Sequence, residues 1–340
     1  MDKVSILIPC YNAEEYLSDS IESALMQTWP HCEVIIVDDG SIDNSLSIAR
    51  SYEGERVTII QQSNQGASAA RNRAFQAATG EYVQYLDADD LLHPRKIEDQ
   101  ITALQERGPM TVAVCSTVYF QDGKPPDQGR RAKGEDDIPW LSSDDPARWL
   151  VNLWTPQHGW GMVGLHAWLT PSSVVEATEP WNEDISLNDD GDFFTRALLN
   201  SAGVEYVSGV SVYYRQHSGE RISGLVSKEA LRGYLQSVDT QREYILPHVE
   251  KEYRARARLA IARNYWKVAL RSLPMSSDIS REASNRARQL GMSEPPDSVL
   301  SETRKGRFTR KLFGWRGARH LQHWYRRIKS GAAQINTNNQ

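Results

Sequence analysis

Short β-rich runs alternate with helical segments through the first hundred residues, and this alternation limits the fold more than any other feature of the chain. Strands are predicted at residues 4–8, 34–37, 57–60 and 82–86. Helices are predicted between and after them, at residues 17–25, 45–52, 68–78 and 94–105. The run 34–37 is apolar throughout, which is typical of a strand buried on both faces of a parallel sheet. Repeated strand–helix units of this length predict an α/β fold with a doubly wound, mostly parallel sheet.

The character of the chain changes after residue 105. The expected order of elements is a strand at 111–120, a polar loop at 121–145, a Trp-dense segment at 146–181, a helix at 191–203, and two short strands at 204–207 and 212–214. From residue 227 onward only helical patterns remain. We therefore expect three parts, at residues 1–105, 106–225 and 226–340, and we call the last one the C-terminal extension.

Composition and charge exclude several classes of protein. No run of about 18 apolar residues occurs, so no transmembrane helix is expected, and no signal peptide is expected at the N-terminus. The three cysteines have no paired spacing, which fits a reducing cytosol and predicts a cytoplasmic protein. Residues 301–340 carry ten Lys or Arg against one Glu, a net +9, which leaves −14 for residues 1–300. An acidic body without a basic stripe does not suit nucleic acid.

Polar residues gather directly after the predicted strands. Four clusters follow the strands in order: Pro9-Cys10-Tyr11-Asn12-Ala13-Glu14, Asp38-Asp39-Gly40-Ser41, Asn64-Gln65-Gly66 and Asp87-Ala88-Asp89-Asp90. Turn chemistry alone accounts for any one of them, because loops collect Asp, Asn, Gly and Ser. Four such clusters at strand ends predict a ligand site, since ligands of these sheets bind at the carboxyl ends of the strands.

Asp87 and Asp89 have the clearest chemical logic. They stand two residues apart, directly after the predicted strand 82–86. When a strand ends in an irregular turn, one such carboxylate can coordinate a hard divalent ion while the other holds a ribose or a metal-bound water. Asp oxygens suit Mg²⁺ or Mn²⁺ rather than zinc. A solvated turn is the alternative for an isolated Asp-x-Asp, and the position after a strand favours the metal site.

Four motifs together resemble those of a known enzyme family. They are Val4-Ser5-Ile6-Leu7-Ile8-Pro9-Cys10-Tyr11-Asn12, Val37-Asp38-Asp39-Gly40-Ser41-Ile42-Asp43, Asn64-Gln65-Gly66-Ala67-Ser68-Ala69-Ala70-Arg71-Asn72 and Tyr85-Leu86-Asp87-Ala88-Asp89-Asp90. In this order and spacing they look like family 2 glycosyltransferases, which are inverting enzymes with the GT-A (Rossmann-like) fold. The resemblance is detailed over residues 4–105 and looser to about residue 220.

The resemblance implies metal-dependent transfer of a sugar from a nucleotide-sugar, most simply a UDP-sugar, to an acceptor hydroxyl. Mn²⁺ or Mg²⁺ would be the cofactor, a glycan or lipid-linked molecule the acceptor, and bacterial surface polysaccharide or lipopolysaccharide synthesis the setting. Residues 1–105 would form the nucleotide-sugar-binding half of the GT-A domain and 106–225 the acceptor-binding half. Two rivals stay open. A sugar-phosphate nucleotidyltransferase would be expected to have a Gly-rich basic loop after the first strand, and a non-catalytic nucleotide-sugar-binding homologue would be expected to lose carboxylates.

The same resemblance assigns roles to individual residues. Those implied to bind the nucleotide-sugar are Pro9, Tyr11, Asn12, Glu14, Asp39, Gly66, Arg71, Asp87 and Ala88. The first four would border the base and ribose, and Asp39 would accept a hydrogen bond from the uracil ring. Arg71 would lie near the base or diphosphate, or else be an exposed helix charge. Asp89 would be a metal ligand, and His217, in Tyr213-Tyr214-Arg215-Gln216-His217-Ser218, would be either a further ligand or a surface histidine.

An acidic pair precedes the predicted helix 191–203. Asn188-Asp189-Asp190-Gly191-Asp192 is similar to the family's Glu-Asp element, with Asp189 in place of the usual Glu. The resemblance implies that Asp190 is the general base, with Asp189 beside it, and Asp192 is the first alternative. Helix capping is the structural alternative for acidic residues here, and it does not exclude catalysis. The helix dipole predicts that Asp190 is ionised at neutral pH.

Two further patterns each have two interpretations. Gly159-Trp160-Gly161-Met162-Val163-Gly164 matches a dinucleotide fingerprint, but no strand is expected before it, so a Trp- and Gly-lined acceptor pocket is the preferred interpretation. Residues 304–329 interleave aromatic residues with Lys and Arg. This predicts either an interfacial helix that makes peripheral contact with the inner face of the plasma membrane, or a helix packed on the body.

Overall fold

A single mixed sheet forms the centre of the molecule. The computed structural model describes residues 2–131, 142–155, 163–217, 227–273 and 275–296, together with Gly314, Trp315 and Gly317. Across these residues nine strands form one sheet in the order β3-β2-β1-β4-β8-β6-β9-β5, with β7 paired to β6. The strands are β1 (Val4–Cys10), β2 (Cys32–Asp38), β3 (Val57–Gln61), β4 (Tyr82–Tyr85), β5 (Leu91–Leu92), β6 (Thr111–Gln121), β7 (Arg130–Arg131), β8 (Trp168–Pro171) and β9 (Gly203–Gln216).

The first half of the sheet is parallel, as the sequence predicts. β1 pairs with β2 on one side and with β4 on the other, and β2 pairs with β3. Helices α1 (Leu17–Leu25), α2 (Ser45–Ser51) and α3 (Ala67–Ala77) connect these strands, and every residue of β1 is buried. The strand order reverses between β1 and β4, so the loops after these two strands diverge. A crevice of this kind is the usual ligand site of doubly wound sheets.

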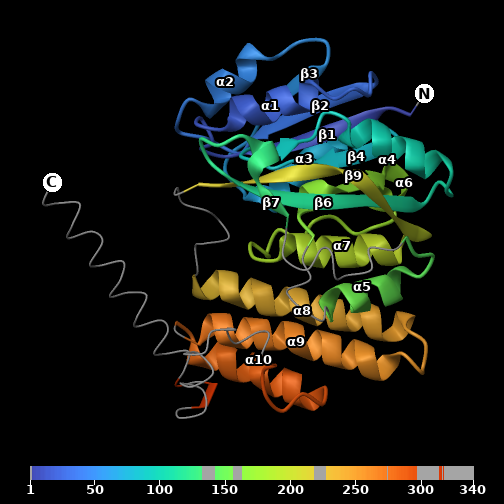
Figure 1. Ribbon diagram of the computed structural model, residues 1–340. Helices are drawn as coiled ribbons and strands as arrows, with labels where there is room; N and C mark the ends of the chain where they lie inside the picture. Colours follow the sequence, from blue (N-terminus) through green and yellow to red (C-terminus); the bar gives the residue numbers. More distant parts are fainter. Residues whose placement is uncertain are drawn as a thin grey trace, which may run out of the picture.

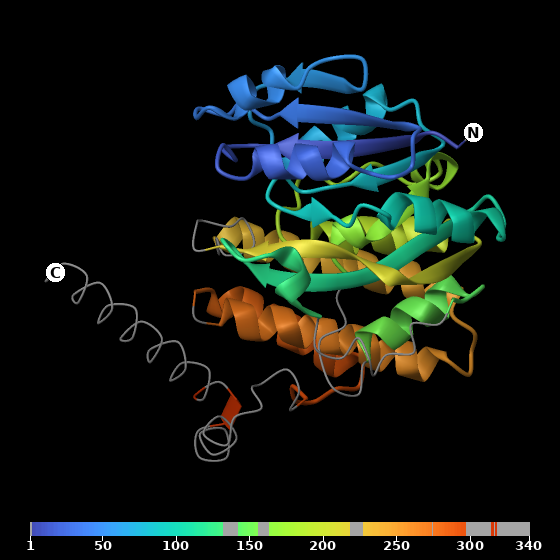
Figure 2. The same ribbon diagram turned by 45° about the horizontal axis from the view of Figure 1, so that its top comes forward.

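The second half of the sheet is mixed. β8 lies antiparallel to both β4 and β6 and so joins the two halves, while β6 and β9 run parallel for most of their length (Figure 2). The two short strands predicted at 204–207 and 212–214 are one strand, β9. Ser208 and Gly209 lie between the two predicted strands. They form an exposed irregularity, after which pairing with β6 resumes. β5 and β8 are too short for an apolar pattern to predict them.

The remaining helices lie on both sides of the sheet (Figure 1). They are α4 (Lys96–Gln105), α5 (Pro146–Trp154), α6 (Ser172–Glu176), α7 (Asp189–Leu199), α8 (Lys228–His248), α9 (Arg254–Ser272) and α10 (Ser277–Gln289), with short 3-10 turns η1 (Pro126–Gln128) and η2 (Leu165–Ala167). Figure 1 shows α7 between the sheet and α8, with α9 and α10 in further layers. The predicted helical extension is therefore confirmed, and it packs directly on α7.

The tryptophans of residues 146–181 belong mostly to the core. Trp149, Trp154, Trp168 and Trp181 are all at least nine-tenths buried. Most of the proposed acceptor pocket at 159–164 lies outside the described residues, as does nearly all of the basic tail. Trp315 of that tail is buried against Trp266 of α9, with ring centroids 5.2 Å apart. Among the described helices, none combines the length and the apolar character that crossing a bilayer requires.

Candidate active site

The loops after β1 and β2 are tied together by side chains. Asn12, at a φ of 48°, accepts a hydrogen bond from the Ile42 amide through Oδ1 at 2.9 Å. Glu14 accepts two from Asn44, at 2.9 Å from the amide and 2.8 Å from Nδ2. Asn12 and Glu14, which the sequence assigns to the base and ribose, thus join the two loops. Tyr11 is 47% exposed beside them and remains open to a ligand.

Asp39 holds the loop that follows β3. Its Oδ1 accepts from the Gln65 amide at 2.9 Å and from Gln62 Nε2 at 2.8 Å, and its Oδ2 accepts from the Gly66 amide at 2.8 Å. Gly66 has a φ of 94°, a backbone conformation that favours glycine. The predicted nucleotide residues Asp39 and Gly66 therefore meet in one turn at the carboxyl edge of the sheet.

Arg71 joins the two acidic clusters. Its Nη2 donates to Asp87 Oδ1 at 3.0 Å and its Nη1 to Asp189 Oδ2 at 2.6 Å, while the guanidinium lies 4.6 Å from the Trp181 ring centroid. Burial alone would lower the pKa of Arg71, but the two carboxylates raise it, so the group is cationic. Arg71 is not the exposed helix charge that was the alternative. It connects α3, the end of β4 and the start of α7.

Asp89 and His217 form a pair in which the Asp89 carboxylate is partly exposed and the His217 ring is nearly buried. His217 Nε2 lies 3.1 Å from Asp89 Oδ2, and the Asp89 side chain is 36% exposed. Two adjacent ligands of an octahedral ion, each at about 2.1 Å, stand about 3.0 Å apart. The 3.1 Å separation is that of a hydrogen bond, and it is also compatible with both atoms holding one divalent ion. His217 is not simply a surface histidine, since its ring is also 4.7 Å from that of Tyr16.

Arg215 fixes the Asp-x-Asp loop against β9, and sequence reasoning missed it. Its Nε donates to the Asp89 carbonyl at 3.0 Å, and its two Nη atoms contact Asp122 at 2.8 Å and Asp19 at 2.7 Å. Its backbone amide donates to Asp90 Oδ1 at 2.7 Å. No local pattern could have found this residue, because its partners lie 93 to 196 positions away along the chain.

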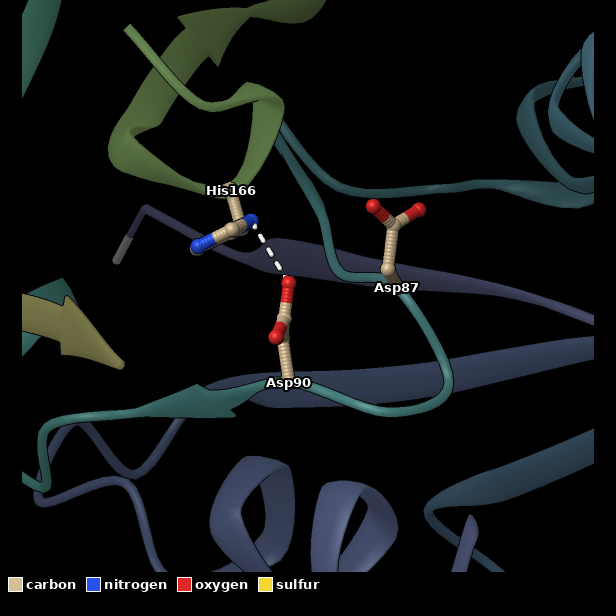
Figure 3. Close-up of side chains that lie close together, drawn as sticks. All are labelled: Asp87, Asp90 and His166. Carbon is tan, nitrogen blue, oxygen red and sulfur yellow. Dashed lines mark ion pairs between the residues drawn. The ribbon is translucent and has the colours of Figure 1, made fainter. Parts of the chain in front are cut away.

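A second acidic group lies deeper. Asp87, Asp90 and His166 offer ligand atoms that all lie within 4.8 Å of one another, and His166 Nδ1 faces Asp90 Oδ2 at 3.4 Å, with Asp87 to one side (Figure 3). Burial and nearby Lys96 lower the pKa of His166 to about 3, so the ring is neutral and the contact is no charge pair. His166 and Asp90 are both at most 2% exposed. The Asp87 side chain is 30% exposed, so this group meets solvent through Asp87.

Asp190 lies half-buried at the start of α7. Burial, followed by the charge of Asp189, raises its pKa to about 7, although the Gly191 amide, which donates to Asp190 Oδ1 at 2.7 Å, and Arg71 oppose the rise. The sequence predicted an ionised group on the strength of the helix dipole. Partial loss of solvation, together with the charge of Asp189, outweighs that dipole. Asp192, the alternative base, is instead paired with Arg196 at 2.7 Å inside the core.

Comparison with known sequences assigns this arrangement to a family. Residues 5–161 match the model of the family described as Glycosyl transferase family 2. The chain is similar to the putative teichuronic acid biosynthesis glycosyltransferase TuaG of Bacillus subtilis, with 40% identity over 37% of this chain and 51% of TuaG. It is similar to the putative glycosyltransferase EpsH of the same organism, with 29% identity over 71% of each chain. The match with TuaG thus spans about half of that relative.

Solved structures share the fold at low sequence identity. TarS from S. aureus, residues 1–349 in complex with UDP-GlcNAc, superposes with a TM-score of 0.59 and 18% identity, over 84% of this chain and 92% of that one. The mannosyltransferase PcManGT from Pyrobaculum calidifontis, in complex with GDP-Man and Mn²⁺, gives a TM-score of 0.52 and 15% identity, over 95% and 87%. These likenesses extend into the helical extension. With motifs, sheet order and sequence relatives in agreement, residues 5–161 belong to the family 2 glycosyltransferases, and the chain has the GT-A fold.

Proposed function

We propose that this glycosyltransferase moves a sugar from a UDP-sugar to an acceptor hydroxyl, with Asp190 as general base. One observation carries the proposal: Arg71 bonds Asp87 on the donor side and Asp189 on the acid-pair side at 3.0 and 2.6 Å. The donor-side carboxylates and the acid pair therefore share one site. The complex of TarS with UDP-GlcNAc supports a uridine donor.

The proposed chemistry is a single in-line displacement. Asp190, in its ionised form, accepts the proton of the acceptor hydroxyl as the hydroxyl oxygen attacks the anomeric carbon. Because one displacement occurs on the face opposite the leaving diphosphate, the anomeric centre inverts. Arg71 keeps Asp87 and Asp189 in place throughout. A divalent ion bound by Asp89 and His217 would supply positive charge for the leaving diphosphate, and the Mn²⁺ in the PcManGT structure supports its presence.

The rivals differ in their products. Incubation with a panel of nucleotide-sugars, with and without Mn²⁺, should release free UDP from one UDP-sugar, faster with acceptor. A nucleotidyltransferase would instead consume a nucleoside triphosphate and release pyrophosphate. A non-catalytic homologue would bind a nucleotide-sugar and release nothing. Release of no nucleoside diphosphate from any sugar donor would refute the proposed function.

We also propose that residues 304–329 bring the enzyme to a lipid-linked acceptor at an anionic membrane surface. The +9 charge of residues 301–340 supports this, while Trp315, packed on Trp266, is withdrawn from any lipid contact. The full chain should sediment with anionic vesicles and detach as salt rises, because exposed charges are screened within about 8 Å at physiological ionic strength. A chain ending at residue 301 should not sediment. Equal binding of both chains would contradict the proposal.

A further inference from the structure

The segment that leads into Asp190 is held between two helices from opposite ends of the chain. On one side, Asn72 of α3 donates through Nδ2 to the Trp181 carbonyl and accepts the Trp181 amide, both at 2.9 Å. On the other side, α8 approaches so closely at Gly233 that an added Cβ would lie 3.3 Å from the Asp184 carbonyl oxygen. The start of α7 is therefore fixed by the C-terminal extension as well as by the nucleotide-binding half.

Two polar side chains of α8 reach the first turn of α7 itself. Ser237 Oγ accepts from Asn188 Nδ2 at 2.8 Å, and Asn188 is the left-handed residue, φ 63°, from which α7 begins. Gln241 Nε2 donates to the Gly191 carbonyl at 3.3 Å. Ser237 is fully buried and Gln241 is 3% exposed. The two contacts bracket Asp189 and Asp190 along the chain.

A third helix fixes Gln241 in turn. Asn264 of α9 donates through Nδ2 to Gln241 Oε1 at 3.0 Å, which sets the orientation of the amide toward Gly191. Ser237 also donates to the Tyr234 carbonyl at 2.9 Å. Displacing Ser237 or Gln241 would leave buried hydrogen-bonding groups unpaired, so these contacts favour one geometry. These contacts hold Asn188 and Gly191, the residues on either side of Asp189 and Asp190.

We infer that Ser237 and Gln241 are positioning residues for catalysis, which hold Asp190 in the orientation that proton transfer requires. The C-terminal extension then contributes residues that position the catalytic base. This inference rests on the proposed function, in which Asp190 is the base. It predicts that the two residues affect turnover and leave donor and metal binding alone, because neither Asp39 nor the Asp89–His217 pair contacts them.

Gln241→Met tests the inference, since it keeps the length of the side chain and removes both amide contacts. The turnover number should fall about ten- to a hundredfold, the scale of a small misplacement of a catalytic group. UDP and Mn²⁺ affinity, measured by calorimetry, should stay within about twofold. Ser280→Ala is the matched control, because Ser280 is equally buried in the extension and donates to the Ala269 carbonyl at 2.8 Å, remote from α7. It should keep native turnover.

A double-mutant cycle separates positioning from a general loss of structure. If Gln241 acts through Asp190, Gln241→Met should lower turnover no further in an Asp190→Asn background. An equal fall in both backgrounds, an equal fall in Ser280→Ala, or a loss of UDP affinity would each overturn the inference and leave the base assignment intact. Near-native turnover of Asp190→Asn alone would instead refute the base itself. Should Gln241→Met fail to fold, Ser237→Ala, which removes only a hydroxyl, enters the same cycle with the same expected results.

Discussion

Single residues in the site are governed by competing electrostatic effects, and Asp190 is the clearest case. From the sequence, a carboxylate at a helix start is expected to be ionised by the dipole. In the fold its pKa is raised to about 7, because burial and Asp189 together outweigh Arg71 and the Gly191 amide. A base with a pKa near the working pH combines a useful ionised fraction with a strong drive to accept the proton. The identity of the residue was predictable, but its burial was not.

Removing the charge at this position should stabilise the protein. A raised pKa in the folded state means that the native protein binds the proton more tightly than the unfolded chain, so stability falls as pH rises from about 4 to about 7. Asp190→Asn removes the cost of holding a charged carboxylate in the folded protein, and its side chain keeps an oxygen that accepts from the Gly191 amide. Its free energy of unfolding should exceed the wild-type value by about 1–3 kcal/mol at pH 8.5, and by less at pH 5.5.

The control for this prediction lies on the same helix. Asp192→Asn leaves the buried Arg196 guanidinium without its carboxylate, which is 2.7 Å away in the native protein, so it should destabilise at both pH values. Denaturant unfolding of the three proteins at each pH gives the answer. If Asp190→Asn is less stable than the wild-type protein at pH 8.5, the ionised Asp190 carboxylate does not destabilise the native fold.

Metal affinity distinguishes the Asp89–His217 pair from the group of Asp87, Asp90 and His166 as the site of the ion. Asp89→Asn and His217→Ala should each weaken Mn²⁺ binding in the presence of UDP by at least about tenfold, since each removes a proposed ligand. His166→Asn, which alters only the inner group, should change it by less than about threefold. Calorimetric titration of the folded variants tests this. Loss of affinity in the His166 variant with native affinity in the His217 variant would move the ion to Asp87 and Asp90.

At the scale of elements, the sequence predicts best where one strand or helix has a pattern of its own. Strands β1 to β4 and helices α1 to α4 follow from apolar periodicity and turn chemistry. The start of α7 does not, because it depends on a left-handed Asn188 that α8 holds from a distance. β8 is four residues long and is defined by the strands on either side of it. Elements that depend on distant partners carry no local signal.

Gly191 tests how tightly the start of α7 is defined. An added Cβ would lie 2.5 Å from Asn188 Nδ2, so Gly191→Ala must displace the side chain that bonds Ser237. Alanine also favours a helix by about 1 kcal/mol over glycine, and the net stability should therefore change little. Turnover should fall about tenfold with unchanged UDP affinity.

A second glycine supplies the matched comparison for that substitution. Gly108→Ala meets nothing within 4 Å, and it should leave both turnover and stability near native. Steady-state kinetics and thermal unfolding of the two variants give the comparison. Native turnover in Gly191→Ala would show that the α7 start tolerates movement and is not a constrained part of the site.

At the scale of the whole molecule, the carboxyl edge of the sheet brings the motifs together much as the sequence predicts. Parallel strands end at one edge, so clusters that follow β1, β2, β3 and β4 had to be neighbours. The sequence could not show that Arg71 reaches Asp189, 118 positions away, or that α8 touches the start of α7. Both contacts depend on the packing of the second half of the chain. The site residues of the first half of the chain were thus predictable from local motifs, and the contacts of the second half only from the fold.

The central claim is that glycosyl transfer at this site uses Asp190 as its base. Its most direct test is the rate of UDP release from the preferred donor, measured against pH for the wild-type protein and for Asp190→Asn, with UDP affinity measured in parallel. The wild-type rate should fall as pH drops below about 7, because protonation of Asp190 removes the base. The Asp190→Asn rate should be lower by about 10²–10⁴-fold and should lose this pH dependence, with UDP affinity unchanged. Near-native turnover of Asp190→Asn, with the same fall at low pH, would contradict the claim.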